Sequence, residues 1–466
     1  MLTFFNVLGQ QKNVLFIVVD DLRPELGCYG NPIVKSPNID KLASEGIVFE
    51  KAYCQQAVCG PSRASFLSGL RPNSTNVFDL KTRLQESVPN TLTLPLFFKN
   101  KGYEVISLGK IYHNRGENGD DPNSWTELEW HPQGQWKGRG YLTKEAQSKI
   151  YNTNRKKGVG PSTEKAAVSD NMYPDGVLAD EAIDRLKGFK KSGKPFFLAC
   201  GFQKPHLPFN APKRYWDIYN PETLYQTSQK SWPVDMPKRA GNKSGELKSY
   251  TDIPQKKKNW DKSIETNLIH GYYASVSYVD AQIGKVVEEL DRLDLRKSTI
   301  IVLLGDHGWK LNDYGAWCKH TNFEIDARVP LIISAPQYKT NKNSPALVEL
   351  VDVYPTLADF CNFEIPTHCE GASLIPLLKK PNKKWKQVAL SQYPTSGSMR
   401  YSIRSGKWRY TEWIDKENHI VERELYDHSK SQLADRNYAK DKKYQSIVKK
   451  LSKQLDKGNG WKKFQK

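Results

Sequence analysis

The stretch NVLFIVVDD, residues 13–21, contains the strongest fold signal in this 466-residue chain. Its near-continuous apolar run is typical of a strand that is buried on both faces of a parallel sheet. The run ends abruptly in two acids, Asp20 and Asp21. Adjacent carboxylates are costly at such a place unless a cation lies between them. An ordinary polar strand end is the alternative, but ligands of open parallel sheets gather at the carboxyl ends of strands.

Three further apolar runs end in polar residues of the same kind. They are residues 104–110, which lead to Lys110 and His113, residues 195–201, which lead to His206, and residues 298–304, which lead to Asp306 and His307. Helical spacing appears between them, at 175–191 and 265–293. A fifth strand over 327–336 and a helix over 347–360 are predicted next. Strands that alternate with helices predict an α/β fold, a mainly parallel, doubly wound sheet flanked by helices.

The pattern changes after residue 383. Residues 401–404 and 407–413 resemble antiparallel strands, and a basic amphipathic helix is predicted around 444–455. We therefore expect a catalytic domain over residues 1–383 and a smaller α+β domain, with a small antiparallel sheet and a helix, over 384–466. Residues 114–173 and 207–262 have weak periodicity and are predicted to be irregular insertions, the second at the rim of a cleft.

The acids at the strand ends predict a metal site. If one sheet edge gathers Asp20, Asp21, Asp306 and His307, the set holds three carboxylates and one imidazole. Such a set suits Ca²⁺ or Mg²⁺ better than zinc, which prefers thiolate and imidazole. The ion would polarise a substrate oxygen and hold the nucleophile. Taken alone, Asp306 and His307 between two glycines are equally consistent with a simple turn.

The string CGPSRASFLSG, residues 59–69, is the candidate centre of catalysis. Pro61 suits the first turn of a helix, and Gly69 is a stop signal. Helix N-termini attract anions, so Cys59 would meet a negatively charged substrate there. The alternative for Cys59 alone is a buried structural cysteine beside a solvent-facing arginine, Arg63.

The same string, continued by Leu70 and Arg71, resembles the signature of type I sulfatases. Further stretches resemble iduronate 2-sulfatases: residues 58–69, 109–113, 204–209, 306–311, 351–356, 401–404 and 408–413. The likeness runs nearly end to end and departs in the two insertions and at Gly60, Cys318 and His320. It implies an alkaline-phosphatase-like fold and the hydrolysis of sulfuric esters.

The resemblance also implies the roles of six residues, namely Cys59, Arg63, Lys110, His113, His206 and Lys319. Cys59 would be oxidised by a maturation enzyme to formylglycine, whose hydrated aldehyde is the nucleophile, and would add a ligand to the metal. The arginine and the two lysines would stabilise the charge of the sulfate. His113 would hydrogen-bond the formylglycine and help to eject sulfate, while His206 with Lys319 would protonate the departing oxygen.

Composition sets the partners that are considered. A formal net charge of +19 fits either a polyanionic substrate or a lysine-rich solvated surface. A nucleic-acid-binding protein rests on charge alone, because no recognised nucleic-acid motif accompanies it. No stretch approaches the roughly 20 apolar residues of a membrane span.

Cysteine usage and the N-terminus bear on the compartment. Seven cysteines are too few for a disulfide scaffold of this length. Cys361 and Cys369 either close a small loop or remain free thiols. Residues 1–10 are interpreted as the tail of a truncated signal peptide. We expect a periplasmic or secreted protein, mainly because sulfatases of this kind are usually exported.

The predicted substrate is a sulfated, uronic-acid-containing polysaccharide or its oligosaccharides, either a glycosaminoglycan or an algal polymer such as ulvan. One alternative is a phosphate or phosphonate monoester hydrolase on the same fold. Phosphatases of that superfamily typically use Ser or Thr and two zinc ions, and a second histidine-rich metal set is absent from the sequence. Another alternative is an inactive protein that binds sulfated glycans through a basic groove.

Overall fold

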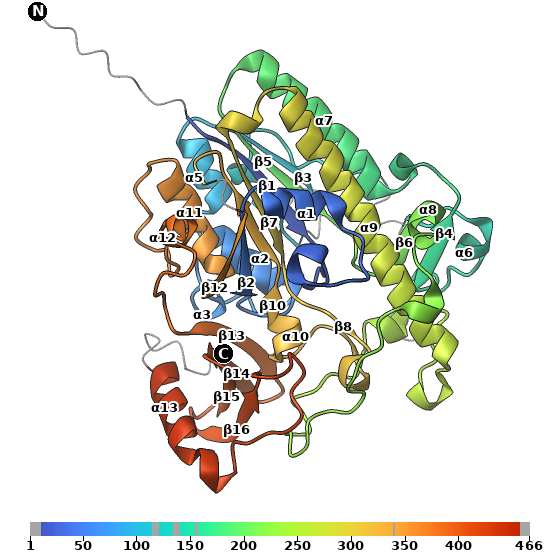
Figure 1. The fold of residues 1–466 in the computed structure, drawn as a ribbon, viewed down its shortest axis with the longest axis vertical. Helices are drawn as coiled ribbons and strands as arrows, with labels where there is room; N and C mark the ends of the chain where they lie inside the picture. Colours follow the sequence, from blue (N-terminus) through green and yellow to red (C-terminus); the bar gives the residue numbers. More distant parts are fainter. Residues whose placement is uncertain (1–10, 114–120, 134–139, 154–156, 339–340, 457–466) are drawn as a thin grey trace, which may run out of the picture.

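The computed structural model describes residues 11–113, 121–133, 140–153, 157–338 and 341–456 (Figure 1). Within these residues an eight-stranded sheet forms the centre of the fold. Its strands are β1 (Asn13–Val19), β2 (Ile47–Tyr53), β3 (Glu104–Gly109), β5 (Phe196–Phe202), β7 (Thr299–Gly305), β10 (Arg328–Val329), β11 (Leu331–Ser334) and β12 (Lys342–Glu349). The order is β10-β2-β11-β7-β1-β5-β3, and β12 also pairs with β2.

The sheet is mixed, with a parallel core. β1 lies between β5 and β7 and is parallel to both, and β3 extends the parallel set beyond β5. The predicted strand over 327–336 is instead two short strands that meet at Pro330, and both are antiparallel to their neighbours. The mainly parallel α/β fold is therefore confirmed. Because β1, β3, β5 and β7 run the same way, their carboxyl ends meet at one edge.

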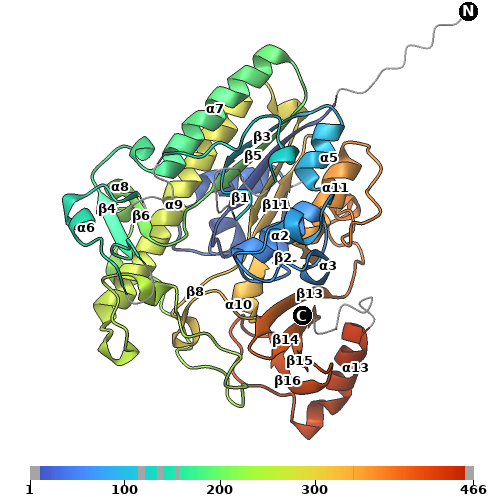
Figure 2. The same ribbon diagram turned by 180° about the vertical axis from the view of Figure 1, so that it is seen from behind.

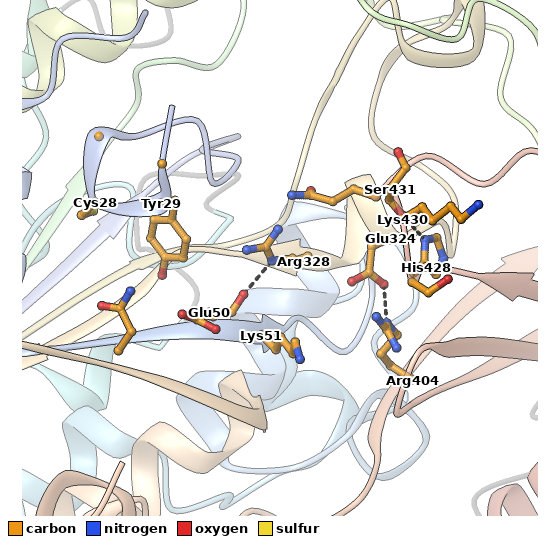
Figure 3. A pocket seen from close by; sticks show the side chains of 15 residues that line it. Cys28, Tyr29, Glu50, Lys51, Glu324, Arg328, Arg404, His428, Lys430 and Ser431 are labelled. Carbon is orange, nitrogen blue, oxygen red and sulfur yellow. Dashed lines mark hydrogen bonds and ion pairs between the residues drawn. The ribbon is translucent and has the colours of Figure 1, made fainter. Parts of the chain in front are cut away.

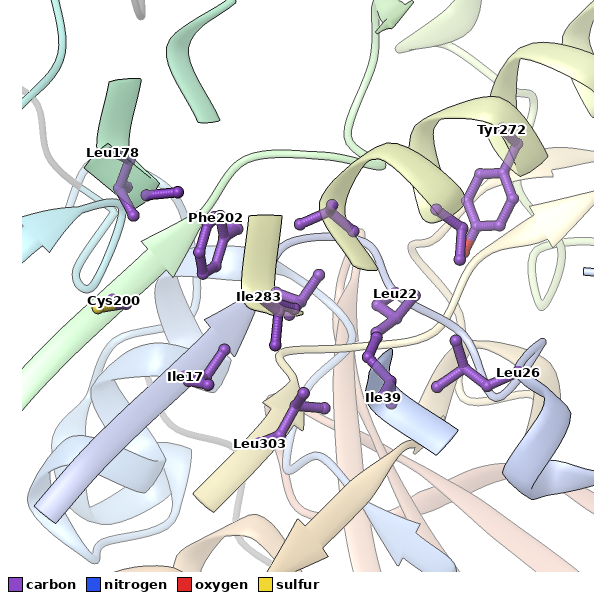
Figure 4. Packing of buried hydrophobic residues seen from close by; sticks show 14 of the residues in the cluster. Ile17, Leu22, Leu26, Ile39, Leu178, Cys200, Phe202, Tyr272, Ile283 and Leu303 are labelled. Carbon is purple, nitrogen blue, oxygen red and sulfur yellow. The ribbon is translucent and has the colours of Figure 1, made fainter. Parts of the chain in front are cut away.

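Helices cover both faces of the sheet. One layer contains α1 (Pro37–Ser44), α7 (Pro174–Ser192) and α9 (Lys262–Arg292). The other contains α2 (Cys59–Ser68), α5 (Leu94–Asn100) and α11 (Val353–Phe360) (Figure 2). In β1 the alternate residues Leu15, Ile17 and Val19 pack in the first layer, where Ile17 lies near Ile283 and Leu303 (Figure 4), and Val14, Phe16 and Val18 pack in the second. This two-sided burial explains the continuous apolar run.

The helix predicted over 347–360 is wrong in its first half. Leu347 and Val348 belong to β12 and pair in register with β2. Glu349 and Asp352 then form a reciprocal capping box around a short 3₁₀ turn, and α11 starts only at Val353. Pairing with a neighbouring strand outweighs the local helical pattern here.

A second sheet lies in the C-terminal part of the chain. Its four antiparallel strands are β13 (Ala389–Thr395), β14 (Ser398–Ser405), β15 (Trp408–Asp415) and β16 (Ile420–Asp427), and α13 (Gln445–Asp456) packs against it. β13 docks on the segment after β2, where the backbone N–H of Gln392 donates to the oxygen of Gln55 at 2.7 Å. The domain boundary at residue 383 stays a prediction.

The two predicted insertions are partly ordered in short elements. They contain α6 (Lys144–Ser148), β4 (Thr163–Ala166), β6 (Phe209–Pro212) and α8 (Lys213–Trp216). β4 and β6 pair in parallel, so the two insertions are joined to each other. The remaining short elements are α3 (Pro72–Thr75), α4 (Leu84–Ser87), α10 (Glu324–Ala327), α12 (Ile375–Lys379), β8 (Lys310–Leu311) and β9 (Trp317–Cys318).

Three smaller expectations can be placed. All seven cysteines lie in the described part of the chain and are free thiols, so Cys361 and Cys369 are not joined. Residues 1–10, interpreted as the tail of a signal peptide, lie outside the described residues. Among the helices described, none has both the length and the apolar character needed to cross a bilayer.

Candidate active site

Cys59 is the first residue of α2, after an extended Val58, and the helix ends at the left-handed Gly69. The side chain is nearly inaccessible, with 2% exposure, and its Sγ lies 3.2 Å from His307 Nε2. Burial, reinforced by Asp20, raises the pKa of the thiol to about 12. An unmodified Cys59 is thus a neutral thiol near pH 7, and a neutral thiol is a poor nucleophile.

The acids at the ends of β1 and β7 meet beside this cysteine. Register places the last residue of β1 opposite the last residue of β7, which brings Asp20 and Asp21 next to Asp306 and His307. Asp306 Oδ1 accepts hydrogen bonds from the backbone N–H groups of Asp21 at 3.1 Å and His307 at 3.0 Å. All four residues are fully buried. The structure therefore brings together the residues that the sequence marked as a metal site.

Three buried cations balance these acids. Arg63 Nε donates to Asp306 Oδ2 at 2.9 Å and its Nη2 to Asp20 Oδ1 at 3.2 Å, while Lys110 forms a very short ion pair with Asp20. Lys319 Nζ donates to Asp21 Oδ1 at 3.0 Å. Burial would raise the pKa of Asp20, but Lys110 and Arg63, helped by a nearby histidine, hold it well below its usual value. Arg63 is therefore buried, unlike the solvent-facing arginine of the alternative interpretation.

Backbone geometry fixes where the two lysines lie. Lys110 follows Gly109, which has φ +72°, and a Cβ on that glycine would lie 2.2 Å from Leu178 Cδ1. Lys319 lies in a turn whose flanking residues, Cys318 and His320, have φ of 67° and 85°. Left-handed backbone at such residues costs free energy and is concentrated at functional sites.

His206 lies at the more open side of the cluster. Its Nε2 is 3.8 Å from Asp21 Oδ2, and its Nδ1 is 2.6 Å from the backbone oxygen of Leu207. Asp175 holds the loop before it by accepting the backbone N–H groups of Gln203 and Lys204. Burial, with Lys319 nearby, lowers the pKa of His206.

His113 is placed differently from the other predicted residues. It lines a small cavity beside α2 together with Gly60, Ala64 and Tyr112. Its predicted hydrogen bond with a formylglycine at position 59 stays a prediction.

Two residues of the cluster were missed by the sequence analysis. Glu246 Oε1 lies 3.2 Å from His206 Nε2, and its Oε2 lies 2.9 Å from Lys319 Nζ and 3.5 Å from His320 Nε2. Glu246 comes from the second insertion, where weak periodicity gives no signal for one acid among many polar residues. His320 was noticed only as a departure from the family pattern.

The donor set suits a hard divalent cation. Ligand atoms of Asp20, Cys59, Asp306 and His307 lie within 4.8 Å of one another, and those of Asp21, Cys59 and His206 form an overlapping group. Burial raises the pKa of Asp21 well above its usual value despite Lys319, a cost that a bound cation would offset. Buried carboxylate oxygens are the ligands that Ca²⁺ and Mg²⁺ prefer.

Formal charges also fit an anionic substrate. Four acids, Asp20, Asp21, Glu246 and Asp306, face three cations, Arg63, Lys110 and Lys319. With neutral histidines the cluster carries one net negative charge, and a divalent ion would reverse it to one positive charge. That charge would complement the single negative charge of a sulfate ester.

Known proteins resemble the chain throughout its length. The family description "Sulfatase" matches residues 12–363, and "N-sulphoglucosamine sulphohydrolase, C-terminal" matches residues 312–460. Human iduronate 2-sulfatase is 32% identical, over 86% of this chain and 85% of its own length. The phosphonate monoester hydrolase of Agrobacterium radiobacter superposes with a TM-score of 0.79 at 20% identity, over 97% of this chain and 96% of the other.

A structure in complex with its substrate, D-glucosamine-2-N,6-O-disulfate, superposes with a TM-score of 0.76 at 23% identity, over 97% of this chain and 98% of the other. At these identities the two superpositions establish the alkaline-phosphatase-like fold alone, while the family match and the human relative establish the enzyme class. The chain belongs to the sulfatase family and is a sulfuric ester hydrolase.

Proposed function

We propose that this enzyme removes O-sulfate from a sulfated, uronic-acid-containing polysaccharide or its oligosaccharides, after Cys59 has been converted to formylglycine. The observation that carries the proposal is the burial of Cys59 against His307 inside a ring of acids and cations. The raised pKa of the thiol supports the conversion, because the cysteine as encoded is protonated at neutral pH.

Formylglycine and a metal ion would each supply one part of the chemistry. Formylglycine would provide a nucleophilic hydroxyl at the head of α2. A divalent cation, held by Asp20, Asp21, Asp306, His307 and residue 59, would polarise a sulfate oxygen. Ca²⁺ is the expected ion, and Mg²⁺ is the alternative.

The chain's own residues would bind the substrate and move the protons. Lys110 and Lys319 would neutralise charge on the sulfate oxygens, while Arg63 holds two of the acids in place. His206 would donate a proton to the departing sugar oxygen, and His113 would help to eject sulfate at the end of the cycle.

The substrate class has two supports. The human relative is named for the 2-sulfate of iduronate, a uronic acid, and a structural relative was solved with a disulfated glucosamine. The net charge of +19 favours a polyanionic carbohydrate, because a positive surface raises the encounter rate with anions. A glycosaminoglycan and an algal polymer such as ulvan both have this chemistry.

The proposal is tested by sulfate release. Protein co-expressed with a formylglycine-generating enzyme is incubated with a panel of sulfated oligosaccharides, and free sulfate is measured by ion chromatography. Peptide mass mapping reports whether residue 59 carries an aldehyde in place of the thiol. We expect release that disappears in Cys59→Ala, with the thermal unfolding midpoint preserved. Activity retained in Cys59→Ala would reject the nucleophile.

A phosphate or phosphonate monoester hydrolase is the competing enzyme. The superposition on a phosphonate monoester hydrolase supports it at the level of fold. The net charge of the cluster with a divalent ion suits a monoanionic ester better than a phosphate monoester dianion. The two enzyme classes are distinguished by comparing rates on sulfate, phosphate and phosphonate monoesters that share one leaving group. A preference for phosphate or phosphonate would reverse the assignment.

A second, non-catalytic possibility is a protein that only binds sulfated glycans. A basic cleft of about 640 Å³ lies between β2, α10 and the C-terminal strands (Figure 3). Its charged lining residues are Glu50, Lys51, Glu324, Arg328, Arg404 and Lys430. A binding protein would show affinity for the glycan and no sulfate release after maturation, whereas the proposed enzyme releases sulfate.

We also infer that the enzyme is exported to the periplasm or secreted. The inference rests mainly on the resemblance, because sulfatases of this kind are usually exported. Fractionation of the native host with an antibody against the chain tests this location. The C-terminal domain is proposed to begin at residue 384.

A further inference from the structure

The acid Glu246 lies at a partly exposed side of the catalytic cluster described above. The side chains of Asp20, Asp21, Arg63, Asp306 and His307 have no exposed surface, and those of Lys110 and Lys319 have 1% and 3%. In contrast, His206, Glu246 and His320 are 13%, 22% and 29% exposed. Among the described residues, this side is open to an approaching substrate and to a departing sugar.

Glu246 is bonded to the two groups that would act on the leaving oxygen. Its Oε1 is within 3.2 Å of both His206 Nε2 and Lys319 Nζ, and its Oε2 is 2.9 Å from the same ammonium. Lys319 Nζ is thereby held between Glu246 and Asp21, with the ring of Trp309 4.8 Å away. Without Glu246, Asp21 would be the remaining carboxylate on the ammonium and would draw it toward the metal site.

The histidine ring is oriented in the same way. His206 Nδ1 faces the backbone oxygen of Leu207 at 2.6 Å, and Nε2 faces Glu246. When the ring is protonated, it can donate to both acceptors, and the two bonds then fix its plane. Nε2 is therefore held on the side from which the sugar leaves.

The backbone near Glu246 is anchored to the strand that leads to Lys319. Asn242 Nδ2 donates to the backbone oxygen of Trp317 at 3.0 Å, and the backbone N–H of Trp317 donates to Ser244 Oγ at 2.9 Å. The second insertion is thus bonded to β9 just before the lysine. The position of the carboxylate follows from these bonds.

We propose that Glu246 is a positioning residue, which holds His206 and Lys319 together at the leaving-group side of the site. This inference rests on the proposed sulfatase function. Its consequence is specific: loss of the carboxylate impairs protonation of the departing oxygen. The loss is therefore larger for leaving groups that need a proton than for those that leave as stable anions.

The test compares two substrates on the matured wild type and Glu246→Gln. Phenyl sulfate has a poor leaving group, phenolate, and 4-nitrophenyl sulfate has a good one, 4-nitrophenolate. We expect kcat/KM on phenyl sulfate to fall about 100-fold, and at least tenfold more than on 4-nitrophenyl sulfate. Glu246→Asp keeps a carboxylate on a shorter arm and should restore part of the phenyl sulfate rate. If Glu246→Gln does not fold, the two esters are compared on Glu246→Asp instead.

The matched control is Glu265→Gln. Glu265 has a similar side-chain exposure of 18%, and its carboxylate forms an ion pair with Lys230 at 2.9 Å. This pair is separate from the catalytic cluster. Its rates should equal those of the wild type. Equal losses on both esters, or no loss, in Glu246→Gln would overturn the positioning role. If the matured wild type releases sulfate neither from these esters nor from the sulfated oligosaccharides, the proposed reaction fails instead.

Discussion

The two carboxylate oxygens of Asp306 bond to different parts of the site. Its Oδ1 accepts two backbone N–H groups, and its Oδ2 accepts from Arg63. In Asp306→Asn the amide oxygen can keep the two backbone bonds, while the NH₂ group faces the guanidinium, donor against donor. We expect a destabilisation of about 1–3 kcal/mol and a metal affinity lower by more than ~100-fold.

Metal content after dialysis, measured by plasma mass spectrometry, checks this prediction together with sulfate release. Asp217→Asn is the control, because Asp217 is an exposed acid paired with Lys213 at 2.7 Å. The control should keep both metal and activity. An Asp306→Asn protein with wild-type metal content would place the ion elsewhere.

At the scale of single residues, the site side chains at strand ends were predictable from the sequence. The residues that contact them from other segments were not. Asp20 and His307 were accessible to prediction because each follows a long apolar run. Glu246 follows no such run and reaches Lys319 only through bonds between an insertion and β9. Contacts of that kind depend on tertiary structure, which local patterns do not encode.

At the scale of elements, α10 joins the two sheets. Glu324 accepts from Arg404 and Arg409 of the C-terminal sheet at 3.0 and 2.8 Å, and from the hydroxyl of Tyr53 on β2 at 2.7 Å. Glu324→Gln would remove the buried negative charge that pairs with the two guanidinium groups. We expect a loss of about 3–5 kcal/mol in the free energy of unfolding, measured by chemical denaturation.

The pH dependence of that loss has a definite sign. Burial would raise the pKa of Glu324, but Arg404 and Arg409 hold it well below its usual value. The ionised carboxylate therefore stabilises the fold above about pH 5, and this contribution is lost as the pH falls toward the depressed pKa. The difference between wild type and Glu324→Gln should shrink in acid. Glu50→Gln, in the same cleft, is the control and should change the free energy of unfolding only slightly.

The elements themselves were predictable in proportion to their burial. β1, β5, β7 and the long α9 are long and strongly patterned, and all four were expected near their observed positions. The last three residues of β12 were predicted to be helical, because they and α11 together have an apolar pattern that pairing with β2 divides. The antiparallel direction of β11 was likewise set by its neighbours.

At the scale of the whole molecule, the charge of +19 predicts a salt-dependent KM. Screening lengths fall to about 8 Å at physiological ionic strength, so long-range attraction of a polyanion weakens as salt is added. We expect KM for a sulfated polysaccharide to rise about tenfold between 0.05 and 0.5 M NaCl, as roughly estimated from charge steering. KM for 4-nitrophenyl sulfate should change much less. Parallel salt curves for the two substrates would contradict the prediction.

The near-complete enclosure of Cys59 determines whether its conversion comes before or after folding. A side chain with 2% of its surface accessible cannot enter the catalytic pocket of another enzyme. The proposed conversion to formylglycine must then take place on the nascent or still unfolded polypeptide, before α2 closes against the strands. Protein that folds first would be trapped in the cysteine form, and refolding in the presence of the converting enzyme, rather than longer incubation with it, would rescue it.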